Sequence, residues 1–199
     1  SLDVKKGEYL VILGPSGSGK STLMNIIGCM DVAGSGTYNL DGAAIQDAKE
    51  KDLVKLRNQK IGFIFQQFHL LPVLTARENI LMPLLLDGRR PDQDYVAYLA
   101  QRLGIEDRLT HLPHELSGGQ QQRVAIARAL AARPDVVFAD EPTGNLDSRS
   151  GGEVMELLIS LQRELGRALV VITHDRGIAA LAQRRFNIAD GVLSEVTGQ

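Results

Sequence analysis

The sequence lacks the features that mark secreted, membrane-spanning and nucleic-acid-binding proteins. A single cysteine, Cys29, excludes an internal disulfide framework and a cysteine-based zinc site. No apolar run approaches the ~18 residues that a membrane span requires, and the polar start after Ser1 is unlike a signal peptide. A net charge of -2 disfavours a partner bound through phosphate neutralisation. We therefore expect no nucleic-acid partner and a cytoplasmic location.

The chain also lacks an initiator methionine. It begins at Ser1 and soon enters its first apolar run, so we expect it to be incomplete at the N-terminus. Its 199 residues suit one large domain with room for a subdomain, and they are ample for a buried core.

Four short apolar runs are typical of strands that are buried on both faces of a parallel sheet. They are Tyr9–Leu13, Ile61–Phe65, 136–139 and 169–172. Apolar residues at helical spacing lie between them, at 23–30, 124–131 and 154–165. Strands that alternate with helices predict an α/β fold with a mostly parallel sheet.

The remaining segments have other patterns. Residues 67–115 show helical patches between prolines, and we predict that they form a mainly helical subdomain inserted into the core. Residues 34–42 are typical of a small antiparallel β arm bounded by turns. Residues 186–193 carry an Asp-Gly turn signal between two short apolar runs.

Unusual polar residues follow each predicted strand at once. A Gly-rich loop follows Leu13, Gln66 follows the second strand, Asp140 and Glu141 follow the third, and His174 lies just after the fourth. In open α/β sheets, ligands bind at the carboxyl ends of the strands. We therefore expect these four segments to form one site.

The Gly-rich loop fits the pattern G-x-x-x-x-G-K-[ST], which binds the phosphates of a nucleotide. Glycines let backbone N–H groups turn toward phosphate, and the next helix presents its positive end. Lys20 would bridge the terminal phosphates of ATP, and the Ser21 hydroxyl would ligate Mg²⁺. This phosphate loop comprises Gly14, Pro15, Ser16, Gly17, Ser18, Gly19, Lys20, Ser21 and Thr22.

Two adjacent carboxylates complete a hydrolytic site. Asp140 follows an apolar strand, at a position from which it can reach Mg²⁺ through a water molecule. Glu141 comes next, and adjacent side chains point to different sides. Glu141 is therefore free to orient or deprotonate the attacking water.

A second helix start has the chemistry of an anion site. Ser117 and Gln120 have the spacing of a capping box, with Gly118 and Gly119 between them. A chain with one phosphate loop has little need of this second site, unless a partner subunit brings the nucleotide to it. We call residues 116–120 the signature.

In these motifs the sequence resembles an ABC-type ATPase subunit over nearly its whole length. The resemblance implies a P-loop NTPase core of the RecA type from residues 1–66 and 116–199, with residues 67–115 as the helical subdomain. It also implies that two copies pair head to tail, so that each signature caps the γ-phosphate of ATP on the other copy's phosphate loop.

The resemblance also assigns roles to single residues. Gln66 would contact Mg²⁺ and the attacking water, and it would couple the site to a membrane partner. Asp147 would act across the dimer interface, and His174 would hold the γ-phosphate and position Glu141. The stretches 21–28, 78–84 and 140–148 are most similar to the lipoprotein-release and macrolide-export group. This group implies a permease subunit, or a fused membrane domain, with the ATPase peripheral on the inner face of the membrane.

One feature of the family is not found. Its members normally carry an aromatic residue well before the phosphate loop, stacked on adenine, and no residue before Gly14 is placed like it. Either the first strands of the fold lie outside this sequence, or the contact with the base is weak.

Two other functions remain to be weighed against transport. One is a soluble ABC ATPase of DNA repair or translation, although the sequence shows neither a heptad tract nor a second ATPase unit. The other is a degenerate module that binds ATP without turnover, which the intact Glu141 and His174 disfavour. The transported substrate cannot be named from this chain, because a motor subunit does not touch it.

Overall fold

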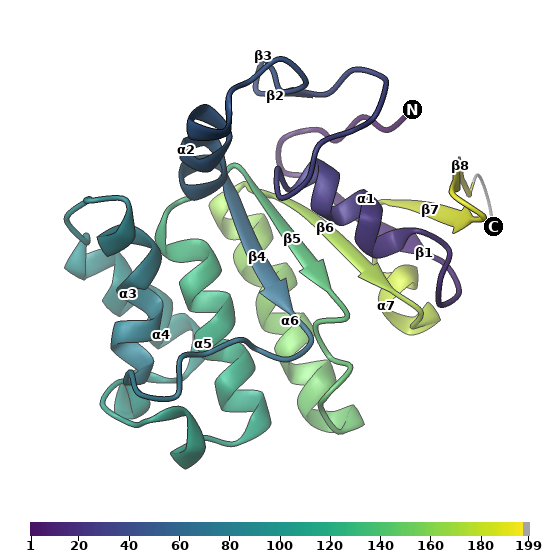
Figure 1. Ribbon diagram of the computed structural model, residues 1–199. Coiled ribbons are helices and arrows are strands. Elements are labelled where there is room, and N and C mark those ends of the chain that lie inside the picture. Colours follow the sequence, from purple (N-terminus) through teal and green to yellow (C-terminus); the bar gives the residue numbers. More distant parts are fainter. Residues whose placement is uncertain (197–199) are drawn as a thin grey trace.

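The computed structural model describes residues 1–196 and shows one central sheet with helices on both faces (Figure 1). The first five strands in spatial order are parallel, and only β8 is antiparallel to its neighbour. The order is β4 (Ile61–Phe65), β5 (Val136–Asp140), β6 (Ala168–Thr173), β1 (Tyr9–Leu13), β7 (Arg184–Ala189) and β8 (Val192–Glu195). The predicted α/β fold with a mostly parallel sheet is confirmed.

The strands are apolar throughout because they separate two cores. In β1, Tyr9 and Val11 face one buried cluster, while Leu10 and Ile12 face the other. Consecutive side chains of a strand point to opposite faces, so a strand covered on both sides needs apolar residues at every position.

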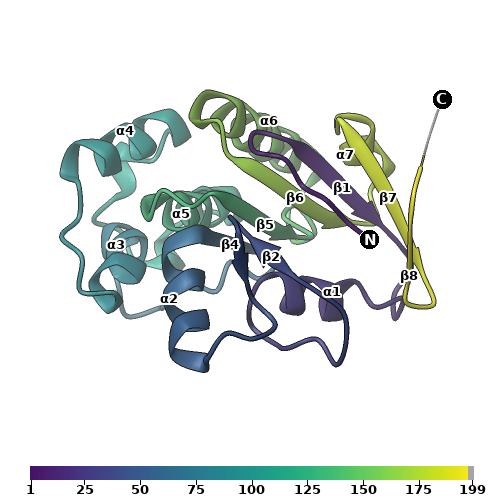
Figure 2. The same ribbon diagram turned by 90° about the horizontal axis from the view of Figure 1, so that it is seen from above.

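The helices cover the two faces unequally. Helices α1 and α2 lie on one face and α5, α6 and α7 on the other, whereas α3 and α4 pack against α5 beyond the edge strand β4 (Figure 2). The helices are α1 (Lys20–Ile27), α2 (Glu50–Lys60), α3 (Ala76–Leu86), α4 (Gln93–Leu103), α5 (Gly118–Ala131), α6 (Ser148–Leu165) and α7 (Arg176–Ala180). Two short 3-10 turns, Glu106–Arg108 and Pro113–Glu115, connect α4 to α5. Residues 67–115 therefore contain no strand.

Side-chain caps determine where most of these helices begin. Oxygen atoms of the capping residues accept hydrogen bonds from the first free backbone N–H groups of each helix. These residues are Thr75 (α3), Asp92 (α4), Ser117 (α5), Asp147 (α6) and Asp175 (α7). Helix α1 differs, since its N-cap Gly19 has no side chain to cap it.

The C-terminal hairpin has the predicted position. Strands β7 and β8 are joined by Asp190 and Gly191, with φ angles of 49° and 76°. Positive φ at both turn residues matches the right-handed twist of a hairpin, which is why Asp-Gly is favoured there.

Four elements have boundaries that differ from the sequence-based expectation. Asp140 and Thr173 belong to strands β5 and β6 instead of following them. The β arm pairs β2 (Asn39–Leu40) with β3 (Ala43–Ala44), so it extends beyond the predicted residues 34–42, whose first part has no strand. Helix α1 ends before Gly28, which abuts the Phe63 ring, so Met30 is not helical but lies exposed after the helix.

Two further expectations concern the single cysteine and membrane-spanning helices. Cys29 is buried as expected, and burial raises the pKa of its thiol. No helix within residues 1–196 combines the length and the apolar character needed to cross a membrane.

Candidate active site

The register of the parallel strands brings the four predicted polar segments to one edge of the sheet. Phe65 pairs with Asp140, Asp140 pairs with Ile172, and Leu13 pairs with Thr173. The strands β4, β5, β6 and β1 therefore end level with one another. The residues that follow them share the carboxyl edge, as expected for a ligand site of this fold.

Close backbone packing shapes the phosphate loop. A Cβ atom at Gly14 would lie 2.5 Å from the carbonyl oxygen of Ile188 in β7, so only glycine fits there. The Gly191 N–H donates to the carbonyl oxygen of Ser18 (3.1 Å), so the β7–β8 hairpin supports the loop from outside. Gly19 has a φ of 100°, which glycine adopts without strain.

The loop exposes groups that suit phosphate. Because Gly19 supplies no side-chain cap, no side chain covers the first backbone N–H groups of α1. The N-terminus of an α-helix also carries a partial positive charge. The Lys20 ammonium donates to the carbonyl oxygens of Gly14 and Pro15, at 2.7 Å each, which keeps it inside the loop. These features fit the triphosphate of a nucleotide.

Glu141 is held from three directions. Thr173 Oγ1 donates to Oε2 (2.9 Å), the His174 backbone N–H donates to Oε1 (3.1 Å), and His174 Nδ1 lies 2.7 Å from Oε1. Glu141 also adopts a left-handed φ of 43°, a strained backbone conformation that clusters at functional sites. The predicted pairing of His174 with Glu141 is therefore present in the chain itself.

The two side chains of this pair differ in exposure. The Glu141 side chain is 16% exposed, whereas that of His174 is 78% exposed and faces solvent. A hydrogen bond and the negative charge of Glu141 raise the pKa of His174 above its usual value. His174 is therefore accessible to a ligand, while Glu141 is fixed beneath it.

Asp140 is a partly buried carboxylate beside Glu141. Burial raises its pKa, the charge of Glu141 raises it further, and Lys20 opposes both effects. Within residues 1–196, no group of three or more His, Cys, Asp or Glu residues is arranged to hold a metal ion.

Gln66 lies against the turn that precedes α6. Its Nε2 atom donates to the side-chain oxygen of Asn145 (3.1 Å). A Cβ atom at Gly144 would lie 2.7 Å from that same Nε2, so glycine leaves the space that the Gln66 side chain occupies.

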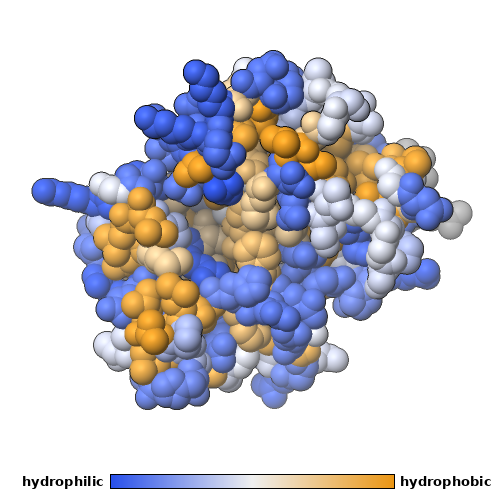
Figure 3. All heavy atoms as spheres, in the orientation of Figure 1, coloured by the Kyte–Doolittle hydropathy of each residue, from blue (hydrophilic) through white to orange (hydrophobic). Residues whose placement is uncertain are grey.

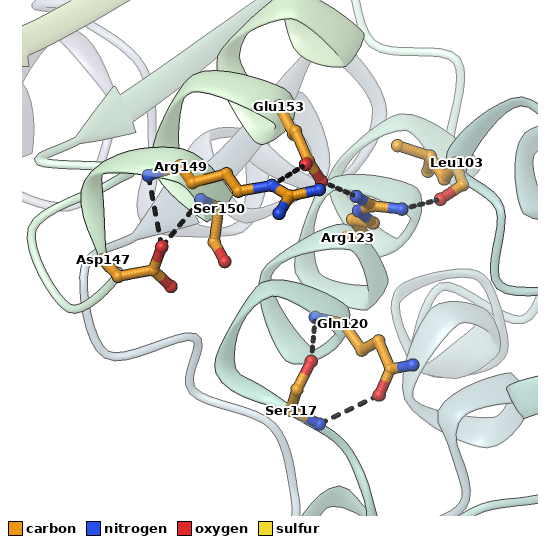
Figure 4. A network of polar contacts seen from close by, with 8 residues as sticks. All are labelled: Leu103, Ser117, Gln120, Arg123, Asp147, Arg149, Ser150 and Glu153. Carbon is orange, nitrogen blue, oxygen red and sulfur yellow. Dashed lines mark hydrogen bonds and ion pairs between the residues drawn. The ribbon is translucent and has the colours of Figure 1, made fainter.

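The signature starts α5 with the predicted capping box (Figure 4). The Gln120 N–H donates to Ser117 Oγ (3.3 Å), and the Ser117 N–H donates to Gln120 Oε1 (2.9 Å). Asp147 lies beside it and caps α6 through the N–H groups of Arg149 and Ser150.

Helices α5 and α6 are joined close to these two caps. Glu153 of α6 accepts from Arg123 of α5 (3.1 Å) and from Arg149 (3.2 Å), as Figure 4 shows. Gly119 faces Ser150 across the same contact. The structure thus brings the signature and Asp147 together on one surface.

The signature and the phosphate loop are not joined in the same way. Among the described residues, no hydrogen bond links 117–120 to 14–22. Within residues 1–196, the two candidate phosphate sites therefore lie at the starts of two different helices, α1 and α5.

Two residues of the site had no role in the sequence-based reasoning. Thr173 holds Glu141, and Asn145 holds Gln66. Thr173 is the last residue of a buried strand and directly precedes His174, which is the one signal that could have identified it.

Together, the phosphate loop, the paired acids at the sheet edge and the parallel sheet define a P-loop ATPase. The family described as ABC transporter matches residues 1–144, and the chain belongs to this family. It is an ATP-hydrolysing nucleotide-binding subunit of the transporter type, and DNA repair is not supported.

Two curated relatives show how similar the chain is to known transporter proteins. It is 48% identical to the lipoprotein-releasing system ATP-binding protein LolD 1 of Chlorobium chlorochromatii, over 96% of this chain and 79% of that protein. It is also 48% identical to the macrolide export ATP-binding/permease protein MacB of Marinobacter nauticus, over 99% of this chain but only 31% of that protein. The resemblance to the lipoprotein-release and macrolide-export group is confirmed.

A solved structure agrees with the fold. The chain superimposes with a TM-score of 0.86, at 42% identity, on a dimeric ATP-binding cassette in a post-hydrolysis state with bound ADP and Pi. The match covers 100% of this chain and 89% of that one.

Proposed function

We propose that two copies of this chain pair head to tail around ATP, so that each signature completes the other copy's phosphate loop. The separation of the two phosphate-type sites within one chain carries this proposal. Ser117 is preset by its capping box, and Asp147 lies on the same surface. The dimeric cassette to which the chain is similar supports the same arrangement.

Hydrolysis in this scheme begins with a water molecule beside Glu141. The carboxylate accepts a proton from the water as the oxygen attacks the γ-phosphorus, and ADP leaves. Thr173 and His174 hold the carboxylate in place, so the carboxylate loses little conformational entropy when the reaction occurs. The exposed His174 ring contacts the γ-phosphate.

The donor atoms near the phosphate loop fit Mg²⁺, which prefers oxygen ligands. The Ser21 hydroxyl, the Gln66 amide oxygen and the Asp140 carboxylate would hold it together with phosphate oxygens and water. Mg²⁺ supplies charge neutralisation at the phosphates. The partly buried Asp140 carboxylate is well suited to face a cation, because a positive charge would offset the cost of its burial.

We further propose that an integral membrane permease, or a membrane domain, docks on the side of α3 and powers export or lipoprotein release through this chain. Leu71, Val73, Leu85 and Leu86 leave large apolar side chains exposed there, and Figure 3 shows apolar surface over α3. The names of LolD and MacB support this partner. Such a chain would be peripheral on the inner face of the membrane.

Replacing Glu141 by Gln tests the catalytic assignment. The amide keeps the size of the side chain but cannot accept the proton, so we expect phosphate release to fall by about 10²-fold or more. Binding of ATP should persist, and the unhydrolysed ATP should hold the dimer together in size-exclusion chromatography.

The exchange Glu156→Gln is the matched control, because Glu156 is an exposed residue of α6 away from the site. It should hydrolyse ATP at the parent rate. If Glu141→Gln also did so, Glu141 would not be the base. If it bound ATP but stayed monomeric, the composite site would be wrong.

A further inference from the structure

Helix α5 carries more than the signature. All of its residues from 124 to 131 are buried, and it packs on both the inserted helices and β4. A Cβ atom at Gly62 of β4 would lie 2.5 Å from the carbonyl oxygen of Ala129, so strand and helix are in direct backbone contact.

Arg128 is the charged residue within this buried part of α5, and its side chain reaches the segment after Gln66. Its guanidinium donates to the carbonyl oxygens of Phe68 (2.7 Å) and His69. The segment after β4 crosses α5 on its way to α3 (Figure 1). Arg128 therefore binds this segment two and three residues after Gln66.

The charge of Arg128 is costly to bury. The residue is 8% exposed, and burial lowers the pKa of its guanidinium because it disfavours the charged form. Its Nη1 and Nη2 atoms donate to backbone carbonyls, and no ion pair joins it to a carboxylate within residues 1–196. A buried charge retained without a counter-ion suggests a requirement beyond packing.

The segment that Arg128 holds is itself strained. Phe68 and His69 have φ angles of 58° and 48°, and consecutive left-handed residues other than glycine need support from their surroundings. The two hydrogen bonds from Arg128 supply it at both residues.

Helix α5 also reaches the segment after Glu141. The buried side chain of Gln122 donates to the carbonyl oxygen of Pro142 at 2.6 Å. One rigid helix thus contacts the backbone just beyond Gln66 and just beyond Glu141, and it begins with the signature.

We propose that Arg128 is a positioning residue for Gln66, acting through the backbone of Phe68 and His69. This inference rests on the proposed role of Gln66 in hydrolysis. The guanidinium fixes the backbone two and three residues after Gln66, and it therefore limits the direction in which the Gln66 side chain can point.

A double-mutant cycle on the full chain tests this coupling. We expect Arg128→Met to lower kcat for ATP about tenfold, because a shift of Gln66 by a fraction of an ångström misorients the attacking water. The KM for ATP should stay within about twofold, since the phosphate loop is untouched. In the Gln66→Ala background, Arg128→Met should change kcat less than twofold, because Arg128 acts through the missing side chain.

Two further variants separate positioning from folding. Arg128→Lys keeps the charge and can still donate to a carbonyl, so it should restore part of kcat even if Arg128→Met folds poorly. Arg89→Met is the control, because Arg89 also donates to two backbone carbonyls, of Ala132 and Asn58, although it has an ion pair with Asp87 as well. It should leave kcat near the parent value in both backgrounds.

The outcomes are distinct. If Gln66→Ala alone leaves kcat unchanged, the proposed role of Gln66 is wrong. If Gln66→Ala lowers kcat but Arg128→Met lowers it by the same factor in both backgrounds, Arg128 has only a structural role and the inference fails.

Discussion

At the scale of single residues, Glu141 is restrained more tightly than the residues around it. Its backbone is in the left-handed region, and three hydrogen bonds hold its carboxylate. Such restraint favours catalysis, because a group that is already oriented loses little entropy when the reaction begins. The fixed Glu141 carboxylate also raises the pKa of the neighbouring His174.

The pKa of His174 should be measurably high. NMR titration of the imidazole signals should give a value above about 6.5 for His174, because the Glu141 carboxylate stabilises the protonated ring. In Glu141→Gln the value should fall back toward that reference. An unchanged His174 pKa in Glu141→Gln would contradict the pairing.

The same shift predicts the sign of a pH effect on stability. A group whose pKa is raised on folding contributes its full stabilisation when the pH is below the unfolded-state pKa. The contribution is lost once the pH exceeds the folded-state pKa. Urea unfolding should therefore show a larger loss for His174→Ala at pH 5.5 than at pH 9, by about 0.5 kcal/mol or less because the ring is exposed.

Sequence patterns identified the proposed ligand-binding residues, but they did not identify the residues that hold them in place. The phosphate loop, Glu141 and His174 were identified from local motifs. Thr173 and Arg128 were given no role, because their partners are a distant side chain and backbone carbonyls. Every residue has a backbone carbonyl, so the sequence does not show which carbonyl a distant side chain will bind.

At the scale of elements, the strands were predicted well because their burial on both faces makes them continuously apolar. Strands β1 and β4 have the expected bounds. Helix α2 was not predicted, since it is polar and buries only Leu53. The β arm was misplaced by a few residues, because two-residue strands carry almost no periodicity.

Close packing of α5 on β4 gives a prediction at this scale. Gly62→Ala would force a methyl group against the Ala129 carbonyl oxygen, so strand and helix must separate. We expect a loss of about 1–3 kcal/mol in the free energy of unfolding, measured with urea.

Gly152→Ala provides the comparison. Gly152 is an exposed residue of α6, and a Cβ atom there meets nothing within 4 Å. Alanine is the better helix former, so this variant should gain up to about 1 kcal/mol. Equal effects at the two glycines would show that the β4–α5 contact is not close.

At the scale of the whole molecule, the proposed dimer implies that each chain supplies half of two sites. The phosphate loop is at the carboxyl edge of the sheet, and the signature and Asp147 form a separate surface. A head-to-tail dimer with twofold symmetry would use both halves of both copies.

This arrangement predicts complementation between two inactive variants. Lys20→Ala weakens the phosphate loop, while Ser117→Glu sets a negative charge against the partner's γ-phosphate. In an equal mixture about half of the dimers are mixed, and each has one intact site, so about a quarter of the parent ATPase rate should return.

Each variant alone should stay near background at the same total concentration, and a mixture of Lys20→Ala with Glu141→Gln should not recover. Both of those defects lie beside the nucleotide of their own copy. Each of the two sites in a mixed dimer would therefore contain one defect. Absence of recovery in the first mixture would indicate that a single chain forms the complete site.

The burial of α5 also bears on how this chain can vary in evolution. Residues 124–131 leave no side chain exposed, and Ala125, Ala127, Ala129 and Ala131 are among them. A larger residue at any of them would need a compensating change in another element. Natural variation that adapts the subunit to different membrane partners should therefore accumulate at the exposed positions of α3, such as Leu85 and Leu86, while α5 tolerates few exchanges.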